Sequence, residues 1–225
     1  MISNPYPGKF ITFEGIDGSG KSEQYARAVN FLKAYFKDLK LALTKEPTDQ
    51  PSGREIYSIL RKQHPTLKLS EMHSYQFQEM YFRDRVWNYR NRVIPWISSG
   101  IHVLADRGPV SVVFGADSYA NFDDLMNIQE QVFKYSGTDF IWPDGNIIYD
   151  VPVEVAMDRM LKSGKVLDQF EEIENLRRVR NNYLAFAQDY DNCYVIDGSK
   201  SPQEVFEMTK NVLYFILGLT DSTDL

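Results

Sequence analysis

The sequence predicts an α/β protein in which five parallel strands form a central sheet flanked by helices, in three layers. Short apolar runs rich in β-branched and aromatic residues recur along the chain, and longer segments with helical periodicity separate them. This alternation is typical of βαβ units, which build parallel sheets. Because the 225 residues contain no internal repeat and no linker, we expect a single domain spanning residues 1–225.

The apolar runs place the expected strands at residues 9–14, 39–45, 102–106, 146–151 and 193–197. Helices are expected at residues 20 to about 37, 71–98, 153–163, 168 to about 189, and 202 to about 217. Ser201 and Pro202 mark the start of the last helix, because proline lacks a donor that the first turn leaves unpaired anyway. In a parallel sheet of this kind, ligands gather at the carboxyl ends of the strands.

The composition argues against several classes of protein. A net charge of −6 is unlike that of a general nucleic-acid binder, whose lysines and arginines neutralise phosphates. The single cysteine, Cys193, cannot form an internal disulfide and fits a structural thiol in a reducing, cytoplasmic compartment. No apolar run approaches the roughly 20 residues of a membrane-spanning helix, so no membrane association is expected.

Residues 15–22 read GIDGSGKS, a full G-x-x-x-x-G-K-[ST] match between an expected strand and an expected helix. Glycines let backbone N–H groups turn toward a phosphate chain, and the start of the following helix adds partial positive charge. Lys21 offers a cation to the β- and γ-phosphates, and Ser22 offers a hydroxyl to Mg²⁺. The motif predicts a P-loop NTPase fold with ATP and Mg²⁺ bound at Gly15, Gly18, Ser19, Gly20, Lys21 and Ser22.

Two plainer interpretations of this loop stay open. It fits a glycine-rich turn between a strand and a helix, although that leaves the Lys-Ser pair unexplained. It also fits a degenerate loop that binds a nucleotide without turnover. Asp106 and Arg107 favour catalysis, because a carboxylate at a strand end beside a phosphate loop can hold a magnesium-bound water.

Six segments follow one another in the order FEGIDGSGKS, KEPTDQPSGREI, YFRDR, VLADRG, LDQFE…RRVRNNYLAF and VIDGSKSPQEV. In these motifs the chain resembles the thymidylate kinase family over nearly its whole length. The resemblance implies transfer of the γ-phosphoryl group of ATP to dTMP, giving dTDP. It also implies an acceptor-nucleotide region at about residues 45–120, a lid at about residues 161–170, and no partners beyond small nucleotides and a second copy of the chain. Trp87, Tyr89 and Trp96 fit either the interface of such a homodimer or the core.

The resemblance assigns roles in the acceptor region. Lys45 stands where the family commonly has an arginine near the acceptor phosphate, and Arg107 matches the arginine that clamps this phosphate. Tyr81 matches the aromatic residue that stacks on thymine, and Arg85 matches the arginine that bonds a base carbonyl. These two residues are four apart and so share one face of a helix.

Two further residues complete the expected acceptor site. Asp17 matches an aspartate that faces the acceptor sugar, and Ser111 is an additional substrate-binding candidate. Because phosphoryl transfer needs positioning and charge neutralisation more than acid–base chemistry, we expect Asp17 or Glu14 to orient the acceptor.

The lid departs from the family pattern. It offers only Lys162 and Lys165, and Gln169 stands where arginine is common. Arg159, just upstream, is therefore the leading candidate for the cation that acts on the transferred group. Other candidates are Arg177, Arg178 and Arg180 on the next helix. The resemblance also places Lys200, in the turn after the last strand, near the adenine of ATP.

Two glycines leave the identity of the acceptor open. Gly108 replaces a tyrosine of the family, and Gly115 aligns with the ring that crowds the ribose 2′ position, although Phe114 and Tyr119 lie close by in the sequence. A kinase for deoxyuridylate or another pyrimidine monophosphate, and a deoxynucleoside kinase, are the enzymatic alternatives. A regulatory nucleotide-binding module without turnover is the alternative from another class.

Overall fold

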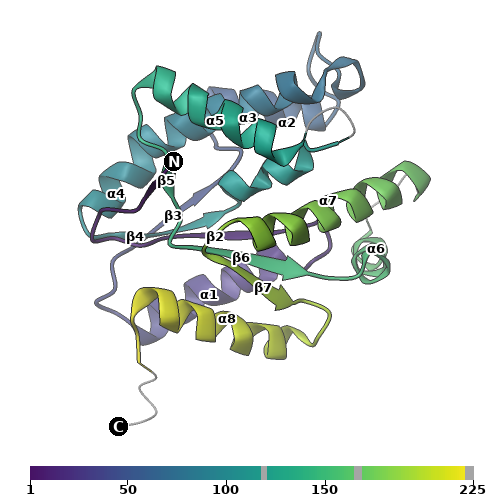
Figure 1. Cartoon of the computed structure of the whole chain (residues 1–225). Coiled ribbons are helices and arrows are strands. Elements are labelled where there is room, and N and C mark those ends of the chain that lie inside the picture. Colours follow the sequence, from purple (N-terminus) through teal and green to yellow (C-terminus); the bar gives the residue numbers. More distant parts are fainter. Residues whose placement is uncertain (118–120, 165–168, 221–225) are drawn as a thin grey trace.

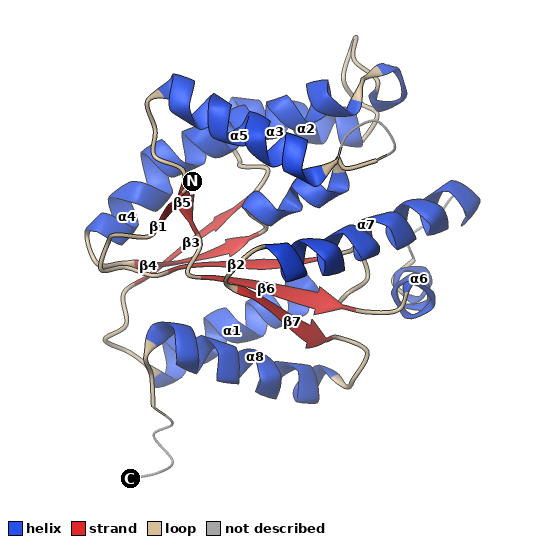
Figure 2. Cartoon of the chain, viewed as in Figure 1, coloured by secondary structure: helices blue, strands red, loops and turns tan. Residues whose placement is uncertain are grey.

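The computed structural model describes residues 1–117, 121–164 and 169–220, and the side chains of residues 169–172 lie outside this description. Within these ranges, a parallel sheet of five strands has the order β3-β4-β2-β6-β7 (Figure 2). The strands are β2 (Phe10–Gly15), β3 (Leu41–Lys45), β4 (His102–Asp106), β6 (Gly145–Asp150) and β7 (Cys193–Asp197). The predicted three-layer α/β fold is confirmed, and each strand lies within two residues of its expected bounds.

Helices cover both faces of this sheet (Figure 1). One face carries α1 (Lys21–Tyr35) and α8 (Pro202–Leu217); the other carries α3 (Ser74–Asn88), α4 (Ile94–Ser98), α5 (Phe122–Ser136) and α7 (Gln169–Asp189). Successive side chains of a strand point to opposite faces. Ile11 and Phe13 therefore pack with α1 and α8, whereas Phe10 packs in the core under α3 and α7.

A small parallel pairing lies beside the main sheet. It joins β1 (Ile2–Ser3) to β5 (Ile141–Trp142) and was not predicted, because two-residue strands carry no pattern.

Cys193, at the start of β7, is partly buried, and burial raises the pKa of its thiol to about 12. None of the helices in the described ranges combines the length and apolarity needed to cross a membrane.

The long helix expected at residues 71–98 is interrupted. Leu69–Glu71 form a 3₁₀ turn, and α3 begins only at Ser74, where Gln76 accepts a hydrogen bond from the backbone N–H of His73. Residues Tyr89–Val93 form a π turn before α4. Pro95 explains this turn, since proline has no N–H and its ring displaces the carbonyl four residues earlier. Tyr89 is fully buried in the core and is therefore excluded from any interface.

Two helices were missed. They are α2 (Pro51–Leu60) and α5, and both carry terminal signals. Pro51 stands in the first turn of α2, Asn121 caps α5 by accepting from the N–H of Asp124, and left-handed Gly137 ends α5. The structure also contains α6 (Val153–Lys162), which was expected, and a 3₁₀ segment at Pro109–Phe114.

Candidate active site

The phosphate loop lies between the end of β2 and the start of α1. Gly18 and Gly20 have φ values of 78° and 89°, which side chains other than hydrogen rarely allow. A Cβ atom at Gly18 would lie 2.4 Å from the carbonyl oxygen of Ala156, so α6 packs directly on the loop. The loop is thus a glycine cradle at a helix N-terminus, which fits a chain of phosphates.

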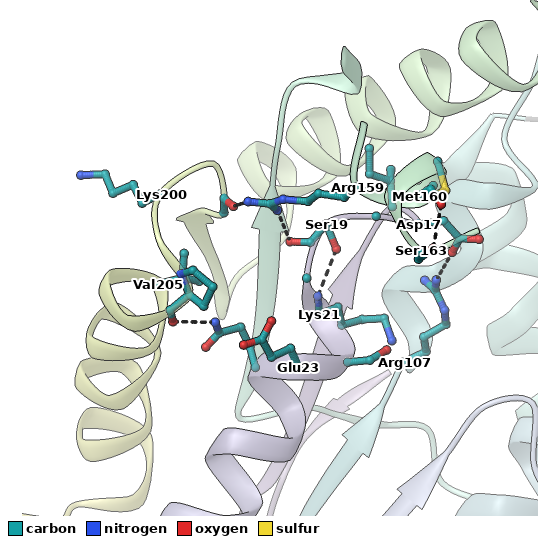
Figure 3. A pocket seen from close by; sticks show the side chains of 17 residues that line it. Asp17, Ser19, Lys21, Glu23, Arg107, Arg159, Met160, Ser163, Lys200 and Val205 are labelled. Carbon is teal, nitrogen blue, oxygen red and sulfur yellow. Dashed lines mark hydrogen bonds and ion pairs between the residues drawn. The ribbon is translucent and has the colours of Figure 1, made fainter. Parts of the chain in front are cut away.

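Two cavities open on either side of this loop. The first, of about 660 Å³, lies between the loop, α6 and the turn after β7 (Figure 3). The second, of about 670 Å³, lies between the loop, α3 and the 109–114 segment. Asp17, Lys21 and Arg107 line both cavities. A group held in one cavity therefore meets a group held in the other at these three side chains.

Lys21 and Asp106 form an ion pair across the junction of β2 and β4. These strands are neighbours in the sheet, with Phe13 opposite Asp106, which brings the loop lysine over the end of β4. Burial, together with nearby Arg107, lowers the pKa of the Lys21 ammonium, while Asp106 acts in the opposite direction. An incoming phosphate would compete with Asp106 for this cation.

The residues present fit a magnesium ion. Ser22 lines the first cavity and Asp106 the second, and both offer the oxygen ligands that Mg²⁺ prefers. In the described part of the chain, no group of three or more His, Cys, Asp or Glu side chains could hold a metal alone. A bound Mg²⁺ would therefore share its coordination with phosphate oxygens and water, as is usual in kinases.

Arg107 is held across the junction by several contacts. Its Nη2 lies 3.2 Å from Oδ1 of Asp17, and its Nη1 donates to the carbonyl of Gly15 at 3.1 Å. The guanidinium also stacks on Phe114, 4.6 Å from the ring centroid. Its backbone is left-handed, with φ of 72°. Such a conformation costs energy in a residue with a side chain and persists where surrounding contacts impose it.

Glu14 is a buried carboxylate that holds neighbouring residues of this site in place. It is fully buried and accepts hydrogen bonds from the N–H of Gly108 (2.7 Å), Ser111 Oγ (2.8 Å) and Tyr183 OH (2.8 Å). Burial raises the pKa of this carboxyl, whereas Arg107 and the hydrogen bonds lower it. Glu14 lines neither cavity, so it positions the segment after β4 and does not reach an acceptor.

The second cavity brings together five of the expected acceptor residues. Lys45, Tyr81 and Ser111 line it together with Asp17 and Arg107. The ring of Tyr81 packs edge-on against Phe77 at 5.3 Å, and Lys45 lies 5.5 Å above the ring of Tyr57. The Ser111 hydroxyl already donates to Glu14, which leaves it able to accept a hydrogen bond from a ligand.

Arg85 requires a correction, because the structure does not place it in this cavity. Its Nε lies 2.6 Å from Oε2 of Glu46, its Nη2 donates to the carbonyl of Gly108 at 2.8 Å, and its Nη1 donates to Gln129. The side chain is 1% exposed. Glu46 is buried after β3 and requires a counter-charge, so Arg85 pairs with it behind the cavity wall and does not face a base.

Arg159 contacts the phosphate loop directly from α6. Its Nη1 donates to the carbonyl of Ser19 (3.3 Å) and its Nη2 to that of Gly198 (2.9 Å), which ties α6 to both sides of the first cavity (Figure 3). Lys200 lines the same cavity at its outer rim, and its ammonium points away from the loop (Figure 3).

The other candidate cations lie elsewhere. Arg180 pairs with Asp150, Arg177 contacts Glu174 and Glu154, and Lys162 pairs with Asp158 on the surface. Arg178 lines the second cavity and donates to the carbonyl of Ala116. Lys165, the side chain of Gln169 and Tyr119 lie outside the described residues.

The sequence did not indicate that Gln78 and Tyr57 line the second cavity. It identified Arg178 as a candidate cation, but not as a residue that lines the acceptor side. For Gln78 a signal existed, because a residue three positions before Tyr81 shares its helical face. Tyr57 and Arg178 had no such signal, because each belongs to an element whose packing on the cavity is a long-range contact.

Comparison with known proteins agrees with this geometry. A family model described as thymidylate kinase matches residues 13–209. The chain is 32% identical over 214 residues to a probable thymidylate kinase of Archaeoglobus fulgidus, covering 95% of this chain and 99% of that protein. It is 30% identical over 209 residues to the thymidylate kinase of Carboxydothermus hydrogenoformans (92% and 97% covered). It is 33% identical over 210 residues to that of Thermosipho africanus (91% and 96% covered).

Proposed function

This chain belongs to the thymidylate kinase family, and from that premise we propose how its two cavities divide the reaction. The protein is an ATP-dependent phosphotransferase that converts dTMP to dTDP. The observation that carries the assignment of sites is the sharing of Asp17, Lys21 and Arg107 by both cavities. Two phosphorylated substrates entering from opposite sides would meet end to end at these residues, as transfer between phosphates requires.

We assign the first cavity to ATP. The phosphate loop and Lys21 would hold its phosphates, and the turn at Gly198 and Lys200 would face its base. Mg²⁺ at Ser22 and Asp106 would neutralise charge on the phosphates. Lys21 would then exchange its ion pair with Asp106 for one with the transferring group.

We assign the second cavity to dTMP. Arg107 presents a planar guanidinium at the junction, which suits two hydrogen bonds to the acceptor phosphate. Asp17 holds that guanidinium and faces the same space, and Lys45 adds a second cation at the rim. Tyr81 would lie against the thymine ring. These side chains position and neutralise, and none needs to remove a proton in the rate-limiting step.

Arg159 would stabilise the charge that develops on the transferred group. Its guanidinium is already anchored to the loop through Ser19. It would therefore lose little conformational freedom on engaging a phosphate. This role replaces that of the lid arginines which the sequence lacks.

The assignment is tested by following ADP release with MgATP and a panel of acceptors: dTMP, dUMP, UMP, CMP, AMP, GMP and free thymidine. We expect turnover to be greatest with dTMP and to be lost in Lys21→Ala and in Arg107→Ala. Lys33→Ala, an exposed lysine on the same helix as Lys21, should retain wild-type turnover. Preference for another monophosphate would reassign the acceptor, and preference for thymidine would indicate a nucleoside kinase. Nucleotide binding without turnover of any acceptor would indicate a regulatory module.

The family resemblance also favours a homodimer that works in the cytoplasm, and we propose both. Light scattering coupled to size exclusion would test the dimer, because a mass equal to that of one chain at micromolar concentration would contradict it. Fractionation of cells that express the protein would test the compartment.

A further inference from the structure

A further cavity lies between α1 and α8, outside the active site. Its volume is about 570 Å³, and none of the described residues that line it lines either active-site cavity. Arg27 of α1 donates to Gln203 of α8 in the first half of both helices. Phe36 meets Tyr214 toward their ends, with ring centroids 6.1 Å apart. The cavity therefore follows both helices away from the phosphate loop, and a space of this size can hold a small organic ligand.

One end of this α1–α8 cavity is aromatic. Phe31 packs edge-on against Phe206 and Tyr214, with ring centroids 5.8 Å and 6.0 Å apart. Tyr35, the last residue of α1, also lines the cavity and is 69% exposed. An exposed aromatic side chain offers its face to another planar ring, and a nucleic-acid base of any kind can stack on it. This end of the cavity therefore suits a planar ring.

The other end contains a continuous chain of polar side chains. Nη1 of Arg27 donates to Oε1 of Gln203 at 3.3 Å, and Nε2 of Gln203 donates to Oε1 of Glu207 at 2.8 Å. The second carboxylate oxygen of Glu207 lies 2.7 Å from Nζ of Lys210. The Glu207 carboxylate thus lies between an amide and an ammonium, with a guanidinium beside them. This set of donors suits an anion.

The carboxylates that pair with the two cations are both half exposed. Arg27 pairs with Glu23 at 2.9 Å, and the side chains of Glu23 and Glu207 are 50% and 52% exposed. Ion pairs at the surface contribute little to stability, so both carboxylates can turn to solvent at small cost. Arg27 and Lys210 would then present two positive charges. A phosphate monoester carries about 1.5–2 negative charges near neutral pH, whereas a carboxylate carries one, so the charges match a phosphate better.

The two ends are separated by a distance that fits a nucleotide. Arg27 and Tyr35 are eight residues apart on α1, which corresponds to a rise of about 12 Å. A ligand that reaches both residues needs a spacer between its ring and its anionic group. In a nucleotide, the sugar is this spacer.

We propose that the α1–α8 cavity is a second nucleotide site, which binds a nucleoside monophosphate outside the active site. The phosphate takes the place of the Glu207 carboxylate between Gln203 and Lys210, and it pairs with Arg27. The base lies against Tyr35. Because no donor or acceptor at the aromatic end is needed for stacking, the site accepts different bases.

Calorimetry with dTMP tests this site while both active-site cavities are filled by a saturating analogue that joins adenosine to thymidine through five phosphates. We expect one further dTMP to bind per chain, and AMP to bind with a Kd within about threefold of that for dTMP. Arg27→Gln and Lys210→Gln should each raise the Kd roughly three- to tenfold, and Tyr35→Ala should raise it about fivefold or more. Lys33→Gln, which changes an exposed lysine of α1 that does not line the cavity, is the matched control.

A variant that should gain affinity separates a ligand site from a purely structural cluster. Glu207→Gln removes the carboxylate that competes with the phosphate, so it should lower the Kd for dTMP about threefold. The inference would be overturned if no dTMP bound at millimolar concentration once the active site was filled, or if the variants of Arg27, Lys210 and Tyr35 bound it like the wild type. Equal affinity for inorganic phosphate would reduce the site to an anion site, and tighter binding of indole-3-acetate than of dTMP would assign it to aromatic carboxylates; either result would also contradict the proposal.

Discussion

Replacing Arg85 by methionine should destabilise the fold far more than it weakens acceptor binding. The side chains of Arg85 and Glu46 are 1% and 4% exposed, and they face each other at 2.6 Å. Removing one partner of a buried ion pair leaves the other charge uncompensated, which costs about 3–5 kcal/mol. The carbonyl of Gly108 and the amide of Gln129 would lose a donor as well.

This cost is measurable as a shift in unfolding. For a chain of this length, each kcal/mol shifts the melting temperature by about 2–4 °C, so Arg85→Met should lower it by roughly 6–20 °C. Urea unfolding without nucleotide would give the free energy directly. Arg83→Met is the matched control, because the Arg83–Glu79 pair on the same helix is 72% and 45% exposed. Its loss should cost no more than about 1 kcal/mol.

A double variant completes the test. Adding Glu46→Gln to Arg85→Met should recover part of the lost stability, because Glu46→Gln removes the carboxylate that Arg85→Met leaves unpaired. The reasoning would be refuted if Arg85→Met unfolded like the wild type and raised the KM for dTMP by two orders of magnitude. That result would restore the direct contact with the base that the sequence motif indicates.

Three further outcomes are expected. Burial raises the pKa of Glu46 above its ordinary value of 4.5, and the charge of Arg85 opposes this shift. The folded state therefore holds this proton to higher pH than the unfolded chain does, so the contribution of Glu46 to stability is full below pH 4.5 and falls as the pH rises above it. Glu46→Gln should flatten this slope in urea unfolding across pH 4–8, and equal slopes would contradict the assignment. Lys21→Met should lower kcat by about a hundredfold or more while the melting temperature stays within a few degrees, and a small loss of kcat would show that the loop lysine does not touch the transferred group. Arg159→Ala should lower kcat at least tenfold with little change in the KM for dTMP, and a selective rise in the KM for ATP would instead assign Arg159 to donor binding.

The elements that depend on neighbouring residues in the sequence were predicted best. The GIDGSGKS loop and the strands before and after it depend on short-range patterns, and β4 and β7 have the bounds that were expected. The predicted start of the helix at residues 71–98 is wrong, because Met72 and His73 are extended and His73 caps a helix that begins at Ser74. Asn121 and Gly137 are likewise local signals for the two ends of α5.

The acceptor side was predicted less well, because its geometry depends on contacts between distant residues. A motif identifies Arg85, but nothing in the sequence pairs it with Glu46, 39 positions earlier. In the same way, the sequence indicates only that Gly115 lacks the aromatic side chain of the family. The structure shows that Gln78 from α3 occupies the space beside Gly115. Residue type and order therefore locate the site, whereas packing decides which side chains face the ligand.

The contact between Gly18 and Ala156 also limits how this protein can evolve. Any side chain at position 18 would collide with backbone atoms of α6, which cannot turn aside as a flexible side chain could. A catalytic cation can therefore be introduced into the phosphate loop at this position only in a lineage whose α6 has already shifted. Until then, selection for faster transfer has to act on α6 itself, where Arg159 stands. A mutational scan of single substitutions would score position 18 as invariant, and only a library that varies it together with α6 would reveal the alternatives.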